Sequence, residues 1–317
     1  MGPAELVQAT AIARQYYVEG MTKVEIADFH GLSRYKVARI LEACRTEGIV
    51  RVEINGGAAM DTELSERLRT HFRLKHALVA SGPFDDVPAL RAALGRAAAD
   101  LLTEIVTEDD VLGVAWGRTL DAMAQRVNGL PPCRIVQMTG IAGAIHASSV
   151  DLVRRLTSVS GGPHHPIYAP LVASDPEALR VMQRQQGIQA AVSRWRTITV
   201  AAVAVGAWDP TGSQVHRVLT ESERAELDSL DTVCEICSIP LDADGRPVRS
   251  TLTERTMAIP YADLVRIPEV IAVAGGEAKT DAVRAALRGG VITSLVTDSA
   301  VAAKLLAEEP ATEEPRR

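Results

Sequence analysis

The spacing of apolar residues along the chain changes after about 55 residues. Up to that point apolar side chains recur every three or four positions, the period that predicts amphipathic helices. Three helices are expected: one that ends near Gly20, one over residues 23–29, and one from Ser33 to about Glu47. Residues 49–54 then alternate apolar and polar side chains, which predicts a short strand or wing. We therefore expect a small domain of three helices and a wing over residues 1–55.

The rest of the chain shows a different pattern, in which short apolar runs alternate with helical stretches. The runs that fit buried strands are residues 77–80, 111–116, 134–138, 198–205, 233–239, 270–274 and 292–297. Helices are predicted at residues 88–106, 119–127, 150–159, 176–186, 277–288 and 299–306. This alternation predicts a doubly wound, Rossmann-like α/β domain with a parallel sheet. We expect it over residues 74–307, after a linker helix within residues 56–73 and before a flexible tail over residues 308–317.

Composition narrows the possible classes of protein. Of the 317 residues 47% are hydrophobic and only 3% aromatic, so the core is expected to consist of small aliphatic side chains, as in helix-covered parallel sheets. No apolar run reaches the ~18 residues of a membrane span, and the N-terminus lacks the pattern of a signal peptide. We therefore expect a cytoplasmic protein that does not enter a membrane.

The four cysteines are too few and too scattered for a disulfide framework. Cys234 and Cys237 form one Cys-x-x-Cys pair, but a zinc site would need a second pair or two histidines at similar spacing. His164 and His165 lie in a Gly-Gly-Pro-His-His-Pro segment, for which an ordered loop is favoured over a metal site. We expect buried cysteines that act as small apolar residues, no metal and no other cofactor.

The net charge of −6 disfavours nucleic-acid binding only until its distribution is considered. Residues 1–55 carry seven Lys or Arg and seven Asp or Glu, so the acidic excess lies in the rest of the chain. Residues 33–41 contain three basic residues and no acidic one. Because local charge decides whether a surface can meet phosphate, this segment is a candidate for DNA contact.

Residues 21–41 have the pattern of a helix-turn-helix. Ala27 suits the crossing of two helices, Gly31 suits a tight turn with positive φ, and Leu32 follows as a core residue. The N-terminal part of the next helix would then face the major groove of operator DNA. Its candidate DNA-binding residues are Ser33, Arg34, Tyr35, Lys36 and Arg39. The alternative is a three-helix packing module whose basic face is merely solvated.

Glycine-rich loops after predicted strands indicate a ligand site in the second domain. In Val-Leu-Gly-Val-Ala-Trp-Gly-Arg-Thr-Leu, residues 111–120, a strand leads directly into a helix, whose unpaired N–H groups favour an anion. Loops of this kind lie at one edge of a parallel sheet. The candidate effector-binding residues are Gly113, Trp116, Gly117, Arg118, Thr119, Thr139, Gly140, Glu235, Gly275, Gly276 and Lys279. The alternatives are tight turns without a ligand, a solvated Lys279 and a Glu235 at the surface or an interface.

Four segments together resemble the SorC family of sugar-responsive transcriptional regulators over nearly the whole chain. They are residues 16–54, the LGVAWGRTL loop, DADGRPV at 242–248, and VIAVAGGEAKTDAVRAALRGGVITSLVTD at 270–298, the most characteristic. The resemblance implies an effector domain related to sugar-phosphate isomerases, homo-oligomers that are commonly tetramers, and binding of a phosphorylated sugar or a related metabolite.

The sequence also departs from that family. Residues 234–238 read Cys-Glu-Ile-Cys-Ser where the family usually has a Gly-Asp-Ile-x-Gly-Arg-type segment, so Glu235 replaces an aspartate, and the glycine and arginine are missing. Met138 and Thr139 stand where some relatives carry a lysine, so a Schiff base is not expected. These differences favour an atypical effector, for instance a polyol or its phosphate.

The leading hypothesis is a transcriptional regulator, repressor or activator, of a carbohydrate or polyol catabolic operon. Its expected partners are double-stranded operator DNA, a small sugar phosphate, sugar or polyol as effector, and further copies of itself in a homodimer or homotetramer. The alternative is an enzyme similar to sugar-phosphate isomerases with an accessory N-terminal domain. Catalysis would need a positioned acid and base, and no such pair is evident, so no catalytic residue is predicted.

Overall fold

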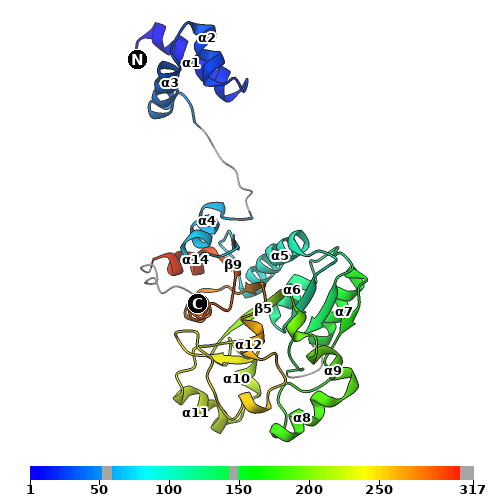
Figure 1. Cartoon of the computed structure of the whole chain (residues 1–317). Helices are drawn as coiled ribbons and strands as arrows, with labels where there is room; N and C mark the ends of the chain where they lie inside the picture. The colour runs from blue at the N-terminus through cyan, green and yellow to red at the C-terminus, as the bar shows by residue number, and fades with distance from the viewer. Residues whose placement is uncertain (52–58, 143–148, 308–317) are drawn as a thin grey trace. The chain divides into compact units, whose positions relative to one another are not determined.

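A computed structural model describes residues 1–51, 59–142 and 149–307. The chain divides into two compact units, Met1–Asn55 and Gly56–Arg317 (Figure 1). Each unit has its own apolar core, and each is described here by itself.

The first unit consists of three helices, α1 (Pro3–Tyr17), α2 (Lys23–His30) and α3 (Arg34–Thr46). Thr22 caps α2 in a capping box with Glu25, and Ser33 caps α3 by accepting a hydrogen bond from Lys36 N. Gly31 ends α2 at φ 64°, a left-handed conformation that glycine adopts without strain. The three helices of the prediction are present. Residues 49–51 form no strand, and the rest of the predicted wing, residues 52–54, lies outside the described residues.

The second unit is built on a sheet of the order β1-β9-β8-β5-β2-β3-β4, in which all neighbours are parallel. These strands are β1 (His76–Ala80), β2 (Val111–Val114), β3 (Arg134–Gln137), β4 (His164–His165), β5 (Val200–Ala207), β8 (Glu269–Val273) and β9 (Ser294–Asp298). From β2 the chain continues outward to β3 and β4 and then returns to β5 on the other side of β2. The strand order therefore reverses between β2 and β5, the place where doubly wound sheets bind ligands.

The α/β fold with a doubly wound parallel sheet is confirmed, but the predicted strand over residues 233–239 is wrong. This run folds into a hairpin of β6 (Cys234–Ile236) and β7 (Ile239–Leu241), and β6 pairs antiparallel with the end of β5. The turn is made by Cys237 and Ser238, both at positive φ (51° and 64°). Two-residue hairpins need such angles and usually signal them with Asn or Gly, which this sequence lacks.

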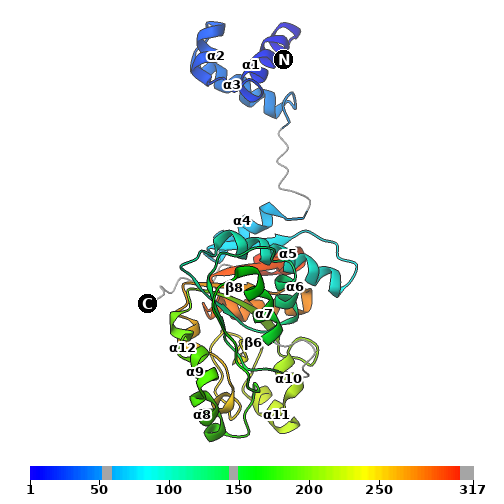
Figure 2. The same ribbon diagram turned by 90° about the vertical axis from the view of Figure 1, so that its right-hand side faces the viewer.

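Helices cover both faces of the sheet (Figures 1 and 2). α5 packs on α6 and α6 on α7, whereas α14 packs on α4 and α13. The helices of this unit are α4 (Thr62–His71), α5 (Val87–Ile105), α6 (Arg118–Ala124), α7 (Ser149–Ser160), α8 (Pro176–Arg184), α9 (Gln186–Val192), α10 (Gln214–Val218), α11 (Glu221–Ser229), α12 (Tyr261–Leu264), α13 (Thr280–Arg288) and α14 (Ser299–Leu306), with 3-10 turns η2 (Trp195–Thr197), η3 (Thr253–Arg255) and η4 (Glu277–Lys279). In the described residues no helix combines the length and apolar character needed to cross a membrane.

Candidate functional site

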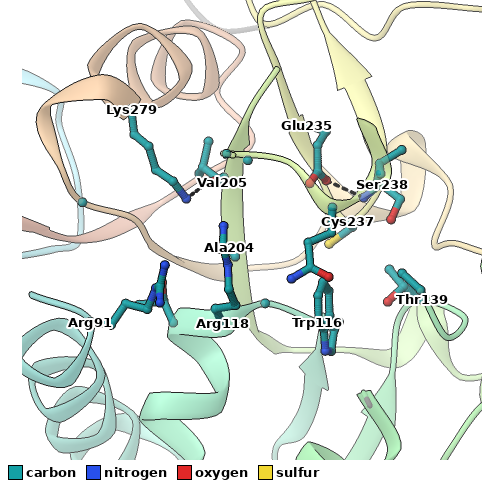
Figure 3. Close-up of a pocket in the computed structure, with 18 of the residues that line it drawn as sticks. Arg91, Trp116, Arg118, Thr139, Ala204, Val205, Glu235, Cys237, Ser238 and Lys279 are labelled. Carbon is teal, nitrogen blue, oxygen red and sulfur yellow. Dashed lines mark hydrogen bonds between the residues drawn. The ribbon is translucent and has the colours of Figure 1, made fainter. Parts of the chain in front are cut away.

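A pocket opens at the carboxyl ends of β2, β5 and β8, at the reversal of strand order. Its empty volume, including the solvent-filled mouth, is about 840 Å³. The walls come from the loop after β2, the end of β5, the β6–β7 hairpin, the loop after β8 and the first turns of α5. Segments far apart in the sequence therefore meet at one site (Figure 3).

Nine of the eleven predicted effector-binding residues line this pocket. They are Trp116, Gly117, Arg118, Thr119, Thr139, Gly140, Glu235, Gly275 and Lys279. Pocket residues that the sequence reasoning missed include Arg91, Gly206, Gln214, Cys237 and Ser238. Arg91 could have been predicted as a candidate, because the helix that follows the first strand begins at the same edge of the sheet as the glycine loops. Cys237 and Ser238 of the hairpin could not have been predicted, since their turn lacks the Asn or Gly that usually marks a two-residue hairpin.

Gly113 and Gly276 do not line the pocket. A β-carbon at Gly113, inside β2, would lie 2.8 Å from Met138 Sδ and 2.9 Å from side-chain carbons of Ile198, so this glycine makes room for core packing. Gly276 has φ 94°, which favours glycine, and donates its N–H to Asp298 Oδ2 at 2.6 Å. It shapes the loop that leads to Lys279.

Lys279, the last residue of η4, projects into the pocket (Figure 3). Its Nζ donates a hydrogen bond to the carbonyl oxygen of Val205 at 2.7 Å. Burial lowers the pKa of this amine, and the like charges of Arg118 and Arg91 lower it further, while the Glu235 carboxyl acts in the opposite direction. The amine is thus partly desolvated and has capacity for further hydrogen bonds to an anion.

Arg118 is the first residue of α6 and lies near Arg91 of α5 (Figure 3). Its Nη2 donates to the carbonyl oxygen of Thr211 at 2.6 Å. Burial lowers the pKa of the guanidinium, as do the charges of Arg91 and Arg217, against the attraction of Asp209. Gly117 permits this approach, because a β-carbon there would lie 2.7 Å from the Ala204 β-carbon. Three cationic side chains therefore share one end of the pocket.

Glu235 of β6 lies among the polar groups at the other end. Its Oε2 accepts a hydrogen bond from Ser238 N at 3.0 Å, and its Oε1 accepts one from Ser213 Oγ at 3.4 Å. Its strand partner Gly206 leaves space for the carboxyl, since a β-carbon there would lie 2.4 Å from Oε1. Burial raises the pKa of Glu235, although the bond from Ser238 and the charge of Lys279 oppose this.

The described part of the chain offers no group of three or more His, Cys, Asp or Glu that could hold a metal ion. Cys234 and Cys237 are buried free thiols, and burial raises the pKa of Cys234 to about 12. His164 and His165 form β4 rather than the predicted loop, because they pair with β3. The chemistry that the pocket offers is charge pairing with an anion at one end and hydrogen bonding to hydroxyls at the other.

The candidate DNA-binding residues all lie on α3 or at its cap. Ser33, Arg34, Tyr35, Lys36 and Arg39 are exposed, Tyr35 to 85%, while Val37, Leu41 and Cys44 on the opposite face are buried. The first turn of α3 contains no acidic residue. The helix therefore presents a basic, acid-free N-terminal face, as a recognition helix requires.

The chain thus combines a helix-turn-helix unit with an α/β unit whose pocket is lined by three cationic side chains. Residues 58–307 match the family model described as "Putative sugar-binding domain". The transcriptional regulator LsrR of Klebsiella pneumoniae is 30% identical over 314 residues, covering 96% of this chain and 94% of the relative. The sorbitol operon regulator SorC of Klebsiella pneumoniae, in its full-length crystal structure, is 26% identical with a TM-score of 0.72, covering 96% of this chain and 99% of the other.

A further relative, the transcriptional regulator YjhU of Escherichia coli K12, is 28% identical and covers 93% of this chain and 92% of its own length. The chain belongs to the SorC family of transcriptional regulators with a sugar-binding domain. These relatives are named as regulators, and the protein is accordingly a transcriptional regulator.

Proposed function

We propose that this regulator controls a carbohydrate or polyol catabolic operon by binding operator DNA through α3 and a phosphorylated sugar or polyol in the pocket. The observation that carries the proposal is the meeting of Arg91, Arg118 and Lys279 at one end of a pocket that lies at the reversal of strand order. In domain terms, residues 1–55 bind DNA, residues 56–73 contain the linking helix and residues 74–307 bind the effector. The predicted tail, residues 308–317, lies outside the described residues.

The charges of the pocket favour a phosphate monoester over a neutral sugar. Among the described residues that line the pocket, three cations face the single carboxyl group of Glu235, whose pKa is raised by burial. Asp209 and Arg217 also act on Arg118, with opposite charges, so an excess of positive charge remains. A phosphate monoester carries about −1.5 to −2 charges at pH 7 and offers three acceptor oxygens. Charge-assisted hydrogen bonds of this kind are about twice as strong as neutral ones. The hydroxyls of the ligand then meet Glu235 and Thr139.

On the DNA side, a single recognition helix reads only a few base pairs. Arg34 and Arg39 are suited to bidentate contacts with guanine, and Lys36 to contact with phosphate or a base edge. Useful specificity requires two half-sites, so a homodimer or homotetramer binds a (pseudo)palindromic operator. Effector binding changes operator affinity by a coupling free energy of about 1–3 kcal/mol.

Calorimetry with matched ligand pairs tests the proposal. The full chain is titrated with sorbitol 6-phosphate and sorbitol, and with glucose 6-phosphate, fructose 6-phosphate and their unphosphorylated sugars. Binding of a phosphorylated ligand at least 30-fold tighter than its neutral counterpart is expected, together with a change in operator affinity. Equal or tighter binding of the neutral sugars would contradict the phosphorylated effector while leaving sugar-controlled DNA binding intact.

A further inference from the structure

One helix of the effector unit, α5, has two faces that border two different spaces. Val87, Leu90, Arg91 and Leu94 line the effector pocket. Ala93, Arg96, Ala97 and Asp100, three to four positions apart on another face, line a separate hollow with an empty volume of about 510 Å³ including its open side. The other walls of this hollow are Ala59, Met60 and Ser81. The helix therefore lies between the pocket and the start of the second unit.

Ala59 and Met60 directly follow residues 52–58, through which the chain arrives from the first unit. They are tied to the end of β1 by an antiparallel bridge between Met60 and Ala80. Ser81 N donates to the carbonyl oxygen of Ala59 at 3.0 Å, and Asp61 N donates to that of Val79 at 2.8 Å. We call this set of contacts the entry bridge.

The entry bridge and α5 are consecutive in the chain. Only residues 82–86 separate Ser81 from the first residue of α5, whose N-cap Asp86 accepts a hydrogen bond from Ala89 N at 2.7 Å. One helical turn later Arg91 reaches the pocket. If the first turns of α5 move, residues 82–86 must change conformation or the entry bridge must move with the helix.

The packing of α5 leaves its first turns more freedom than its middle. At Gly95 the helix meets α6 so closely that a β-carbon would lie 2.7 Å from the Ala122 carbonyl carbon and 2.8 Å from Met123 N. N-terminal to this contact, Val87 is 56% exposed and Ala93 borders the hollow, which continues along α5 past Gly95 to Asp100. Because the hollow is open to solvent, no close-packed neighbour opposes a small shift of α5 on this side.

We propose that α5 transmits effector binding to the entry bridge, with Arg91 as the positioning residue that contacts the anionic group of the effector and draws the first turns of α5 with it. Arg91 is suited to this role because it faces the same anion site as Lys279 and Arg118 but stands on a different element. Burial is the main cause of the lowered pKa values of Lys279 and Arg118, and the like charges close to them lower these values further, so the cations of this site repel one another. An anion between them reverses the sign of the force on Arg91.

The inference rests on the proposed function, since it needs an anion in the pocket, and the test separates the two. The probe is inorganic phosphate, compared with chloride at equal ionic strength, on the full chain. Calorimetry measures phosphate binding, and hydrogen exchange measures the amides of Asp61 and Ser81, the donors of the entry bridge. We expect phosphate to change their exchange rates at least threefold in the wild type.

Two variants test the route. In Arg91→Gln, phosphate still binds to Lys279 and Arg118, and at equal occupancy the bridge amides are expected to exchange as without phosphate. In Ala93→Met, the added side chain fills the hollow, so phosphate affinity stays within threefold of the wild type while the bridge response is lost. The matched controls, Arg126→Gln and Ala92→Met, change residues that line neither space and should keep the wild-type response.

The outcomes are distinguishable. Phosphate that binds the wild type without changing the bridge amides would overturn the inference and leave the proposed function standing. A full bridge response in Arg91→Gln at equal occupancy would overturn the role of Arg91. Absence of phosphate binding to the wild type would contradict the anion-binding pocket itself, and the inference with it.

Discussion

The two basic surfaces of this protein present positive charge to an anion in opposite ways. On α3, Arg34, Lys36 and Arg39 are exposed on one helix, and no side-chain ion pair of theirs occurs within the described residues. In the pocket, Lys279 and Arg118 come from different segments, and each is held by a backbone carbonyl group. The charges on α3 are exposed and independent of one another, whereas those in the pocket are partly buried and influence one another's pKa values.

This difference sets the strength of each surface and its response to salt. Exposed cations cost little without a partner, and salt screens their attraction for DNA phosphates. Enclosed cations are partly desolvated, as the lowered pKa values of Lys279 and Arg118 show, so the empty pocket is electrostatically unfavourable. The proposed phosphorylated effector, as a dianion, would relieve this cost. Single substitutions should therefore have larger effects in the pocket than on α3.

The largest expected effect is the loss of ligand binding in Lys279→Met. The substitution keeps the apolar stem but removes a desolvated charge, and loss of one partner from such a pair costs about 2–5 kcal/mol. Calorimetry should show at least 30-fold weaker binding of the phosphorylated ligand, with operator affinity in the absence of ligand unchanged. Arg184→Met, at an exposed position of α8 outside the pocket, is the control and should bind normally. Near-normal binding in Lys279→Met would remove this residue from the site.

A smaller effect is expected on α3. Arg39→Ala should cost about 1–3 kcal/mol of operator binding if Arg39 makes a bidentate base contact. Lys36→Ala should instead weaken binding to all sequences evenly and reduce the slope of affinity against salt. Fluorescence anisotropy with operator and scrambled DNA at several salt concentrations measures both. Arg14→Ala on α1 is the control, and a folded Arg39→Ala that binds the operator normally would refute α3 as the recognition helix.

Gly113 tests where the pocket ends, because the sequence predicts it as a pocket residue while the structure places it in the packed core. In Gly113→Ala the new β-carbon would press on Met138 and Ile198, and overpacking of a core typically costs about 1–3 kcal/mol. Urea unfolding should show this loss of stability, while the ligand affinity of the folded protein stays within about twofold of the wild type. A selective loss of ligand affinity at unchanged stability would return Gly113 to the site.

The sequence predicted those parts of the molecule whose signals are local. The helix-turn-helix was predictable because its cap, its glycine turn and its buried stripe lie within 24 residues, from Met21 to Cys44. The glycine loops were predictable because each directly follows an apolar strand. Eight of the nine pocket residues were found in this way, and the ninth, Glu235, was predicted from the apolar run over residues 233–239.

The parts that the sequence did not predict depend on tertiary contacts. The start of α5 could be expected at this edge of the sheet, but Arg91 enters the pocket because α5 packs on α6, the helix after β2. The β6–β7 hairpin was not predictable because its turn residues, Cys237 and Ser238, adopt positive φ although neither is a glycine. The surrounding structure must stabilise these backbone angles. Gly113 was assigned to the site because a glycine that avoids a clash and one that approaches a ligand look alike in a sequence.

The smallest expected effect concerns the one carboxyl group among the pocket cations. Burial raises the pKa of Glu235, so between the ordinary carboxyl pKa and this raised value the folded protein keeps a proton that the unfolded chain has released. Stability therefore falls as the pH rises through that window. Glu235→Gln cannot ionise and should be more stable than the wild type at pH 8, with a higher urea midpoint and a higher Tm. The difference should vanish near pH 4.

Glu277→Gln is the control with the opposite sign. The hydrogen bond from Lys304 lowers the pKa of exposed Glu277, so this variant should be less stable than the wild type at pH 8 and equally stable in acid. Urea titrations of the three proteins at both pH values decide the matter, and a Glu235→Gln variant less stable than the wild type at pH 8 would show that the carboxylate is stabilised by the cations around it.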